Sequence, residues 1–311
     1  MKDKIVVSVD GGLGDHITAE PAIRYLIEKV YPGGDVQITC NVPRVFSHLP
    51  VPVHQHGAPN APLESDGYRK LFAFPRDGAI TQAICFLVSH ISNYHAAAMM
   101  YRELPLLDRT IRVGVDESDR AELARVLGGI ETHSLVLVHP GKSWQSKTFP
   151  REWWQATIDA LAADGKRVCL LGKRASSMAH DQTGLVEVDL PSGGVDLRDR
   201  LSLGALFALL EAAPVLLSND TSLIQMAGAF DNWIVLIASC KHPDFVLPYR
   251  NGSPYYKASA LYKRLVIDDL PFEPVRDHAL RVDVPVLDWT PYLPDPLDVV
   301  REISLRLRTL S

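Results

Sequence analysis

The chain has 311 residues, of which 47% are hydrophobic and 22% charged, and its formal net charge is −5. This length is sufficient for two domains of ordinary globular composition. The acidic balance excludes broad, sequence-independent binding to nucleic acid, which requires a net basic surface, but it does not exclude a local basic groove.

The N-terminal half begins with a β-α-β pattern, which implies a parallel sheet. KIVVSVDGG (4–12) predicts a buried strand that ends in a turn. Apolar residues then recur at helical spacing from Ile17 to Val30, PGGD (32–35) ends this helix, and VQITC (36–40) predicts a second strand. Farther along, we expect a helix over much of 78–104, a strand at 109–115 and a helix at 116–129.

The β-α alternation starts again after a candidate linker at residues 128–134. The second half predicts strands at 135–141, 166–172, 214–220 and 233–239, and helices at 150–165, 202–213 and 221–230. A last helix at 294–310 has Asp295 as its N-cap and Pro296 as its first residue. We therefore predict an α/β protein with domains at 1–130 and 131–292, and a C-terminal helix at 293–311 that packs back toward the first domain.

The sequence predicts a cytoplasmic protein. Its N-terminus is not a signal peptide, and no run of about 18 uncharged apolar residues could span a membrane. The four cysteines are far apart and form no C-x-x-C pair or zinc cluster, so we expect reduced, mostly buried thiols. The two histidines of the motif His54-x-His56 have no evident third ligand, so we expect a solvated loop there and not a metal site.

The segment GGLGDHITAE (11–20) joins the first strand to the first helix. It lacks the third glycine of the fingerprint G-x-G-x-x-G and the G-K-[ST] of a Walker loop. Asp15 directly follows the last glycine, and its charge would repel an anion at this loop. Asp15 is therefore either a cap of the helix N-terminus or a general base at the sheet edge where α/β folds bind ligands. The local sequence alone favours the cap.

Two segments of the second half have the composition of phosphate sites. HPGKSWQSKTFP (139–150) leaves a strand and places hydroxyl groups and lysines before a helix. SNDTSLIQMAGA (218–229) again follows a strand end, although a helix capped by Asp220 or Thr221 is the simpler explanation for this segment alone. Two such segments in one domain, with an acidic loop in the other, favour the functional interpretation.

Three stretches resemble glycosyltransferase family 9, which includes the ADP-heptose:lipopolysaccharide heptosyltransferases. GGLGDHITAEPAIRYL (11–26) is similar to the family's opening loop and helix. HPGKSWQSKTFPREWW (139–154) is similar to its donor-phosphate segment, and LRDRLSLGALFALLEAAPVLLSNDTSLIQMAGA (197–229) to its leucine-rich helix and the strand, turn and helix that follow. The three stretches occur in the family's order and cover both halves of the chain.

The resemblance implies a GT-B fold, in which two Rossmann-like doubly wound domains face a cleft. It also implies inverting, metal-independent transfer of a sugar, a heptose or a related one, from a nucleotide diphosphate sugar to the hydroxyl of a glycan or another acceptor. ADP is one candidate nucleotide, and no other cofactor is implied. Asp15 matches the family's base, and Gly12, Gly14 and His16 belong to the same acceptor-side loop.

The resemblance assigns donor binding to the second domain. Lys147 matches the lysine that contacts the donor phosphates, and Leu201 matches an apolar position at the nucleotide base. The other residues of the matching segments are candidate donor contacts, namely Lys142, Ser143, Trp144, Gly172, Asp220, Thr221, Ser222 and Gln225.

The chain departs from the family pattern at several of these positions. The family usually has glycine or alanine at position 222 and histidine at position 225, where this chain has serine and glutamine. The family often has an acidic residue shortly after Gly172, whereas Lys173 and Arg174 follow here. A basic, aromatic loop at 238–250 contains Lys241, which either reaches a substrate or belongs to a solvated turn.

Two alternative functions stay open. A phage-type glycosyltransferase that acts on a modified DNA base would be favoured by a basic cleft in the N-terminal domain. A nucleotide-sugar-binding protein that kept the fold without turnover would explain Ser222 and Gln225, but the presence of both Asp15 and Lys147 argues against it.

Overall fold

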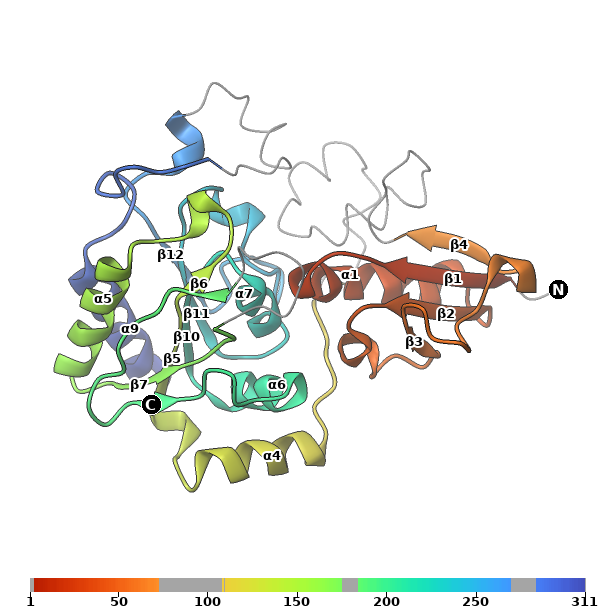
Figure 1. The fold of residues 1–311 in the computed structure, drawn as a ribbon, viewed down its shortest axis with the longest axis horizontal. Helices are drawn as coiled ribbons and strands as arrows, with labels where there is room; N and C mark the ends of the chain where they lie inside the picture. The colour runs from red at the N-terminus through yellow and green to blue at the C-terminus, as the bar shows by residue number, and fades with distance from the viewer. Residues whose placement is uncertain (1–2, 73–107, 109, 175–183, 270–283, 311) are drawn as a thin grey trace.

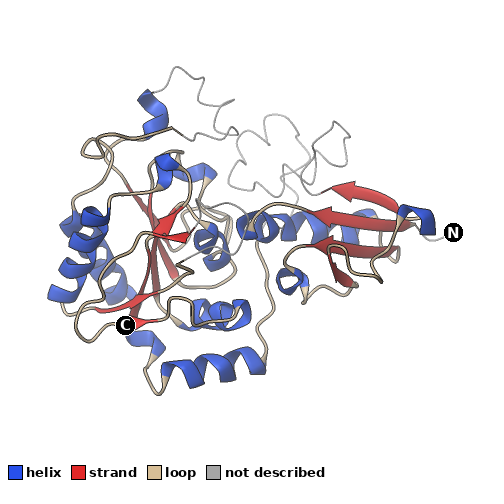
Figure 2. Cartoon of the chain, viewed as in Figure 1, coloured by secondary structure: helices blue, strands red, loops and turns tan. Residues whose placement is uncertain are grey.

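The computed structural model describes residues 3–72, 108, 110–174, 184–269 and 284–310. Figure 1 shows two sheets side by side, and Figure 2 shows helices packed around the strands of each. The helix predicted at 78–104 lies outside the described residues, as does Cys85.

The first sheet contains parallel strands in the order β3-β2-β1-β4. Its strands are β1 (Lys4–Val9), β2 (Asp35–Cys40), β3 (Val53–Gln55) and β4 (Arg69–Phe72). Helix α1 (Leu13–Tyr25) follows β1 and continues into a π-helical segment, Leu26–Val30. The first predicted strand, helix and strand are therefore confirmed, and α1 begins four residues before the first apolar residue of the predicted repeat.

The second sheet is larger, with parallel strands in the order β12-β11-β10-β5-β7-β9. Its strands are β5 (Leu135–His139), β7 (Arg167–Leu170), β9 (Val195–Asp196), β10 (Val215–Asn219), β11 (Trp233–Ile237) and β12 (Ala258–Leu261). A short antiparallel pair, β6 (Gly141–Lys142) and β8 (Gly184–Leu185), lies beside it. The four strands predicted for this half are confirmed.

Helices cover both faces of the second sheet, which explains its continuous apolar strands. Val136 and Val138 of β5 share one core with α5 (Arg151–Ala163) and α9 (Pro296–Leu310). Leu135 and Leu137 point the other way, into the core that contains α6 (Leu203–Ala212) and α7 (Ser222–Ala227). This second core also includes β1 and α1, so apolar packing is continuous between the two sheets.

The C-terminal helix α9 begins at Pro296, and Asp295 Oδ1 accepts a hydrogen bond from the Leu297 amide at 2.8 Å, as an N-cap does. The helix packs against α5 in the second half of the chain, which differs from the expected packing toward the N-terminal domain. The reason is its apolar stripe of Val299, Val300 and Ile303, which the core around Trp154 buries.

The strand predicted at 109–115 is wrong, because the structure assigns no strand to residues 110–115. Side chains of α1 bind this backbone in place of a neighbouring strand. The Arg112 amide donates to Glu20 Oε2 at 2.9 Å, and the Arg24 guanidinium donates to the Thr110 carbonyl at 2.7 Å. The alternating β-branched residues therefore predicted a strand that is not paired with any of the strands in the described part of the chain.

Helix α4 (Glu117–Leu127) packs against α6, with an Arg120–Glu211 ion pair of 2.9 Å between them. Gly204 of α6 lies so close to the Asp119 carboxylate that a side chain there would collide with it. The domain boundary at residue 130 stays a prediction. The contacts between α4 and α6 support a domain boundary that lies before α4.

Two further observations concern the described residues as a whole. None of their helices is both long and apolar enough to cross a membrane. Cys40, Cys169 and Cys240 are buried free thiols, as expected from their spacing, and burial raises the pKa of Cys40 to about 11 and that of Cys169 to about 12.

Candidate functional site

A cavity of about 890 Å³ lies where the loop between β1 and α1 meets the carboxyl ends of the second sheet's strands. Parallel α/β sheets bind ligands at this edge. Leu13, Gly14, Asp15, Thr18 and Val42 line the cavity from the first half of the chain, and loops after β5, β7, β10 and β11 line it from the second. Every predicted site residue except Gly12 and His16 lines this one cavity.

The loop before α1 is built around the Asp15 carboxylate. Asp15 Oδ2 accepts a hydrogen bond from the Gly12 amide at 2.8 Å, so Asp15 does cap this helix end. Gly11, which the sequence analysis did not single out, has φ +100°, and a Cβ there would lie 2.5 Å from Asp15 Oδ2. Only glycine fits that position, because of both the backbone angle and the close carboxylate.

Asp15 combines this capping role with a place in the cavity wall. Burial raises the pKa of Asp15, while the Gly12 amide, His16 and Lys147 partly oppose that shift. The net result is a carboxyl group that is easier to protonate than an ordinary aspartate. This property suits a group that accepts a proton from a substrate and later releases it.

His16 and Gly12 do not line the cavity. His16 is fully buried, its Nδ1 lies 2.8 Å from the Gly12 carbonyl, and its Nε2 accepts from the Asn41 amide at 3.3 Å. These two bonds require the neutral ring, and burial lowers the pKa of His16 accordingly. His16 therefore stabilises the loop between β1 and α1 and does not line the cavity.

Lys147 lines the cavity from the second half of the chain, in the loop after β5. Its ammonium pairs with the Asp220 carboxylate and lies 4.0 Å from the centre of the Trp144 ring. Burial lowers the pKa of Lys147, but Asp220 in particular more than offsets this, so the pKa lies above that of an ordinary lysine. Lys147 therefore remains protonated although it is only 9% exposed.

A second lysine, Lys241, joins this cluster from the loop after β11. Its ammonium lies 5.6 Å from the same Trp144 ring. Burial lowers the pKa of Lys241, and the nearby Lys147 lowers it further. Lys142 lines the cavity as an exposed residue, and the buried Ser143 hydroxyl has no hydrogen-bond partner among the residues that the structure describes.

Asn219 and His139 hold the two loops together, and the sequence analysis missed both. Asn219 Oδ1 accepts a hydrogen bond from the Gly141 amide at 3.0 Å. Asn219 Nδ2 donates to the Gly141 carbonyl at 2.8 Å and also to the Lys147 carbonyl. His139 Nδ1 lies within hydrogen-bonding distance of the hydroxyl groups of Ser218 and Thr221. Burial lowers the pKa of His139 to about 4, so this ring is neutral. Both residues stand at strand ends within the two segments that have the composition of phosphate sites. This position was the signal by which the sequence could have identified them.

The residues that begin α7 contact both halves of the chain. Thr221 is the N-cap, but its hydroxyl bonds Ser218 and His139 and does not cap the helix. Helix α1 packs against α7, and a Cβ on Gly14 in its first turn would lie 3.5 Å from the Ser222 Cα. Gln225 donates to the Val246 carbonyl at 2.5 Å, which connects α7 to the basic, aromatic loop.

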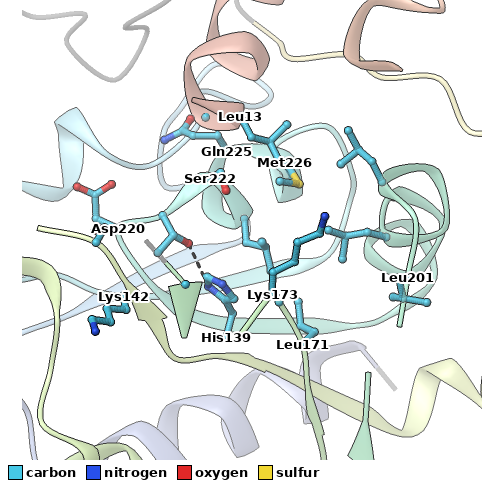
Figure 3. Close-up of a pocket in the computed structure, with 18 of the residues that line it drawn as sticks. Leu13, His139, Lys142, Leu171, Lys173, Leu201, Asp220, Ser222, Gln225 and Met226 are labelled. Atoms are coloured by element: carbon cyan, nitrogen blue, oxygen red, sulfur yellow. Dashed lines mark hydrogen bonds between the residues drawn. The ribbon is translucent and has the colours of Figure 1, made fainter. Parts of the chain in front are cut away.

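Apolar side chains line other parts of the cavity. They include Leu13, Leu171, Leu201 and Met226, and Lys173 extends between Met226 and Leu201 in Figure 3. Gly172 has φ +118°, and a Cβ there would lie 2.7 Å from the His139 ring. Asp199, from the loop after β9, also lines the cavity, and its carboxylate accepts a hydrogen bond from the Arg174 amide at 3.0 Å.

The described residues contain no group of three or more His, Cys, Asp or Glu side chains that could hold a metal ion. The two histidines of the His54-x-His56 motif have protein partners. His54 Nε2 lies 2.8 Å from Gln37 Oε1, and His56 Nε2 lies 3.0 Å from the Val9 carbonyl.

Comparison with protein families identifies the group to which this architecture belongs. Residues 71–255 match the model of glycosyltransferase family 9 (heptosyltransferase). The chain belongs to glycosyltransferase family 9. It is thus a glycosyltransferase of the kind that uses nucleotide sugars, and its fold is GT-B. No curated protein sequence matches it.

Solved structures of the family share the fold at low sequence identity. A family 9 glycosyltransferase from Veillonella parvula DSM 2008 is 14% identical, with a TM-score of 0.64 over 99% of this chain and 98% of that one. The E. coli ADP-heptose LPS heptosyltransferase II is 15% identical, with a TM-score of 0.62 over 98% and 99%. The iron-containing dodecameric glycosyltransferase TibC from enterotoxigenic E. coli H10407 is 17% identical, with a TM-score of 0.64 over 100% and 78%.

The geometry of the glycine loop leads to a testable difference between two adjacent glycines. Gly11→Ala should lower the transfer rate of this family 9 enzyme by roughly 10²-fold, because a Cβ would displace Asp15. Gly12→Ala is the matched control, since its Cβ would lie 3.7 Å from Asp15 Oδ2 and its φ is −83°. Steady-state kinetics of both variants would measure this, and similar rates for the two would contradict the steric role of Gly11.

Proposed function

We propose that this family 9 enzyme is an inverting glycosyltransferase in which Asp15 is the general base and no metal ion is needed. The observation that carries the proposal is that Asp15 lines the same cavity as the Lys147–Asp220 pair, from the opposite half of the chain. Asp15 and Lys147 are close enough for each to shift the other's pKa. The proposed base and the proposed phosphate site therefore line one cavity.

The proposed reaction is a single displacement. The acceptor hydroxyl gives its proton to Asp15 while its oxygen forms a bond to the anomeric carbon. The bond from that carbon to the diphosphate oxygen breaks on the opposite face, so the configuration of the sugar inverts. The leaving diphosphate gains negative charge, which the ammonium groups at the Trp144 ring are placed to stabilise.

We assign the donor to the second domain and the acceptor to the first. The apolar side chains of Leu201 and Met226 suit contact with a planar nucleobase, and the lysines at the Trp144 ring suit the diphosphate. A nucleotide-linked heptose or related sugar is the proposed donor, since a structural relative is named an ADP-heptose LPS heptosyltransferase. We propose a domain boundary before α4, because that helix packs against α6 of the donor side.

A binding screen followed by a product analysis tests this function. Isothermal titration calorimetry should detect binding of at least one common nucleoside diphosphate, and the matching nucleotide sugar should support transfer in the presence of EDTA. The NMR coupling of the new anomeric proton should show the configuration opposite to that of the donor. A product that retains the donor configuration, or a loss of activity with EDTA that added metal restores, would contradict the proposal.

A further inference from the structure

We infer that Lys241 is a second donor-binding residue, and that it supplies the uncompensated positive charge that holds the diphosphate. This inference rests on the proposed function, because it identifies the group that would bind the proposed leaving group. It also assigns a role to the basic, aromatic loop after β11.

The charge of Lys147 is already compensated within the protein. Its ammonium is in contact with the Asp220 carboxylate, and both groups line the cavity. Two opposite unit charges in contact largely cancel at the distance of a ligand beyond them. Asp220 thus keeps Lys147 protonated and in position, but it leaves the pair with little net charge to attract an anion.

Lys241 adds a positive charge at the same place. β11, β10 and β5 are adjacent in the sheet, so the loops that carry Lys241, Asp220 and Lys147 leave it side by side. The two ammonium groups lie 5.6 and 4.0 Å from the centre of one indole ring, that of Trp144. Among the described residues, no carboxylate forms an ion pair with Lys241, which lines the cavity.

The two ammonium groups have one carboxylate in ion-pair contact, that of Asp220, while the Asp15 carboxylate acts on Lys147 from farther away, so positive charge exceeds negative charge at the Trp144 ring. The Trp144 ring offsets part of the repulsion between the lysines through its negative face, but it brings no full charge. The lowered pKa of Lys241 is the expected consequence of burial next to Lys147. A diphosphate bound between the two would relieve this repulsion, and the relief would grow as the leaving group gains charge.

The test compares Lys241 with a lysine outside the cavity. Calorimetric titrations with ADP and with inorganic pyrophosphate would use the wild-type enzyme, Lys241→Met, Lys241→Arg and the control Lys29→Met, whose side chain is exposed and does not line the cavity. We expect Lys241→Met to weaken both ligands by about 10- to 100-fold, as for the loss of one charged hydrogen bond. Lys241→Arg should retain most of the affinity, and Lys29→Met should stay within about threefold of the wild type.

The pH dependence of the wild-type enzyme gives a readout that needs no substitution. Lys147 has a raised pKa and Cys240 has a raised pKa, so both keep their protons, and Asp220 is the acid that faces Lys241. ADP affinity should therefore fall as the pH rises through the lowered pKa of Lys241, where its ammonium is lost. Lys241→Met should show no such fall.

The outcomes separate this inference from the proposed function. Wild-type affinity in Lys241→Met, together with an ADP affinity independent of alkaline pH, would overturn the role of Lys241. If Lys147→Ala still lost binding in that case, the proposed donor site would stand. A wild-type enzyme that binds neither pyrophosphate nor any nucleoside diphosphate would overturn the donor site and the inference together.

Discussion

Asp15→Asn is expected to lower the transfer rate by roughly 10² to 10⁴ while the affinity for nucleoside diphosphates stays unchanged. Asparagine can still accept the hydrogen bond from the Gly12 amide through its carbonyl oxygen, so the loop should keep its shape. What is lost is the ability to take the acceptor's proton. Rates of sugar transfer and calorimetric titrations on the same protein samples would measure both parts.

The pH profile provides the control for this substitution. Since the raised pKa of Asp15 means that it protonates at a higher pH than an ordinary aspartate, transfer by the wild-type enzyme should fall as the pH decreases through that raised value. The residual activity of Asp15→Asn should lack this acidic limb. Equal transfer rates for the two forms would remove Asp15 from the role of base.

Lys147→Ala is expected to weaken nucleoside diphosphate binding by roughly 30- to several-thousand-fold, which corresponds to about 2–5 kcal/mol. The substitution removes one phosphate contact and also leaves the Asp220 carboxylate without its buried partner. That free carboxylate would repel the diphosphate. Calorimetry with the nucleotide that binds best in the screen would measure the loss.

A double substitution separates these two causes. Lys147→Met combined with Asp220→Asn removes both charges, so it should bind the diphosphate better than Lys147→Met alone. If both proteins bound with the same affinity, repulsion by Asp220 would not contribute. Unchanged affinity in Lys147→Ala itself would refute the phosphate contact.

The parts of the fold that the sequence predicted well are those in which local pattern and burial agree. In β5, for example, the residues from Leu135 to Val138 are all apolar, because helices cover both faces of their sheet. Residues 110–115 have a similar local pattern, but Glu20 and Arg24 bind their backbone, and this depends on a contact between distant segments. The same is true of α9, whose apolar stripe is evident from sequence but whose partner α5 is not.

The candidate site also contains residues that the sequence could predict and residues whose roles depend on contacts between distant segments. Residues in the loops and helix starts that follow strands, such as Asp15, Lys147 and Asp220, were predictable because parallel strands bring their carboxyl ends to one edge. Gly11 was missed because its need for φ +100° appears only in the backbone. His16 was placed on the acceptor side because it follows Asp15 in sequence, yet the helix turns it away into the core. The compensation of Lys147 by Asp220, and the resulting importance of Lys241, required coordinates.

The close approach of α1 to α7 has a consequence for substitutions at their point of nearest approach. A Cβ on Gly14 would lie 3.5 Å from the Ser222 Cα, which is an ordinary van der Waals distance, so alanine fits at position 14 and a larger side chain would meet the main chain of α7. Apolar residues of both helices, among them Ile17 and Leu223, belong to one core, so buried side chains also fix the spacing between the proposed base and the donor side.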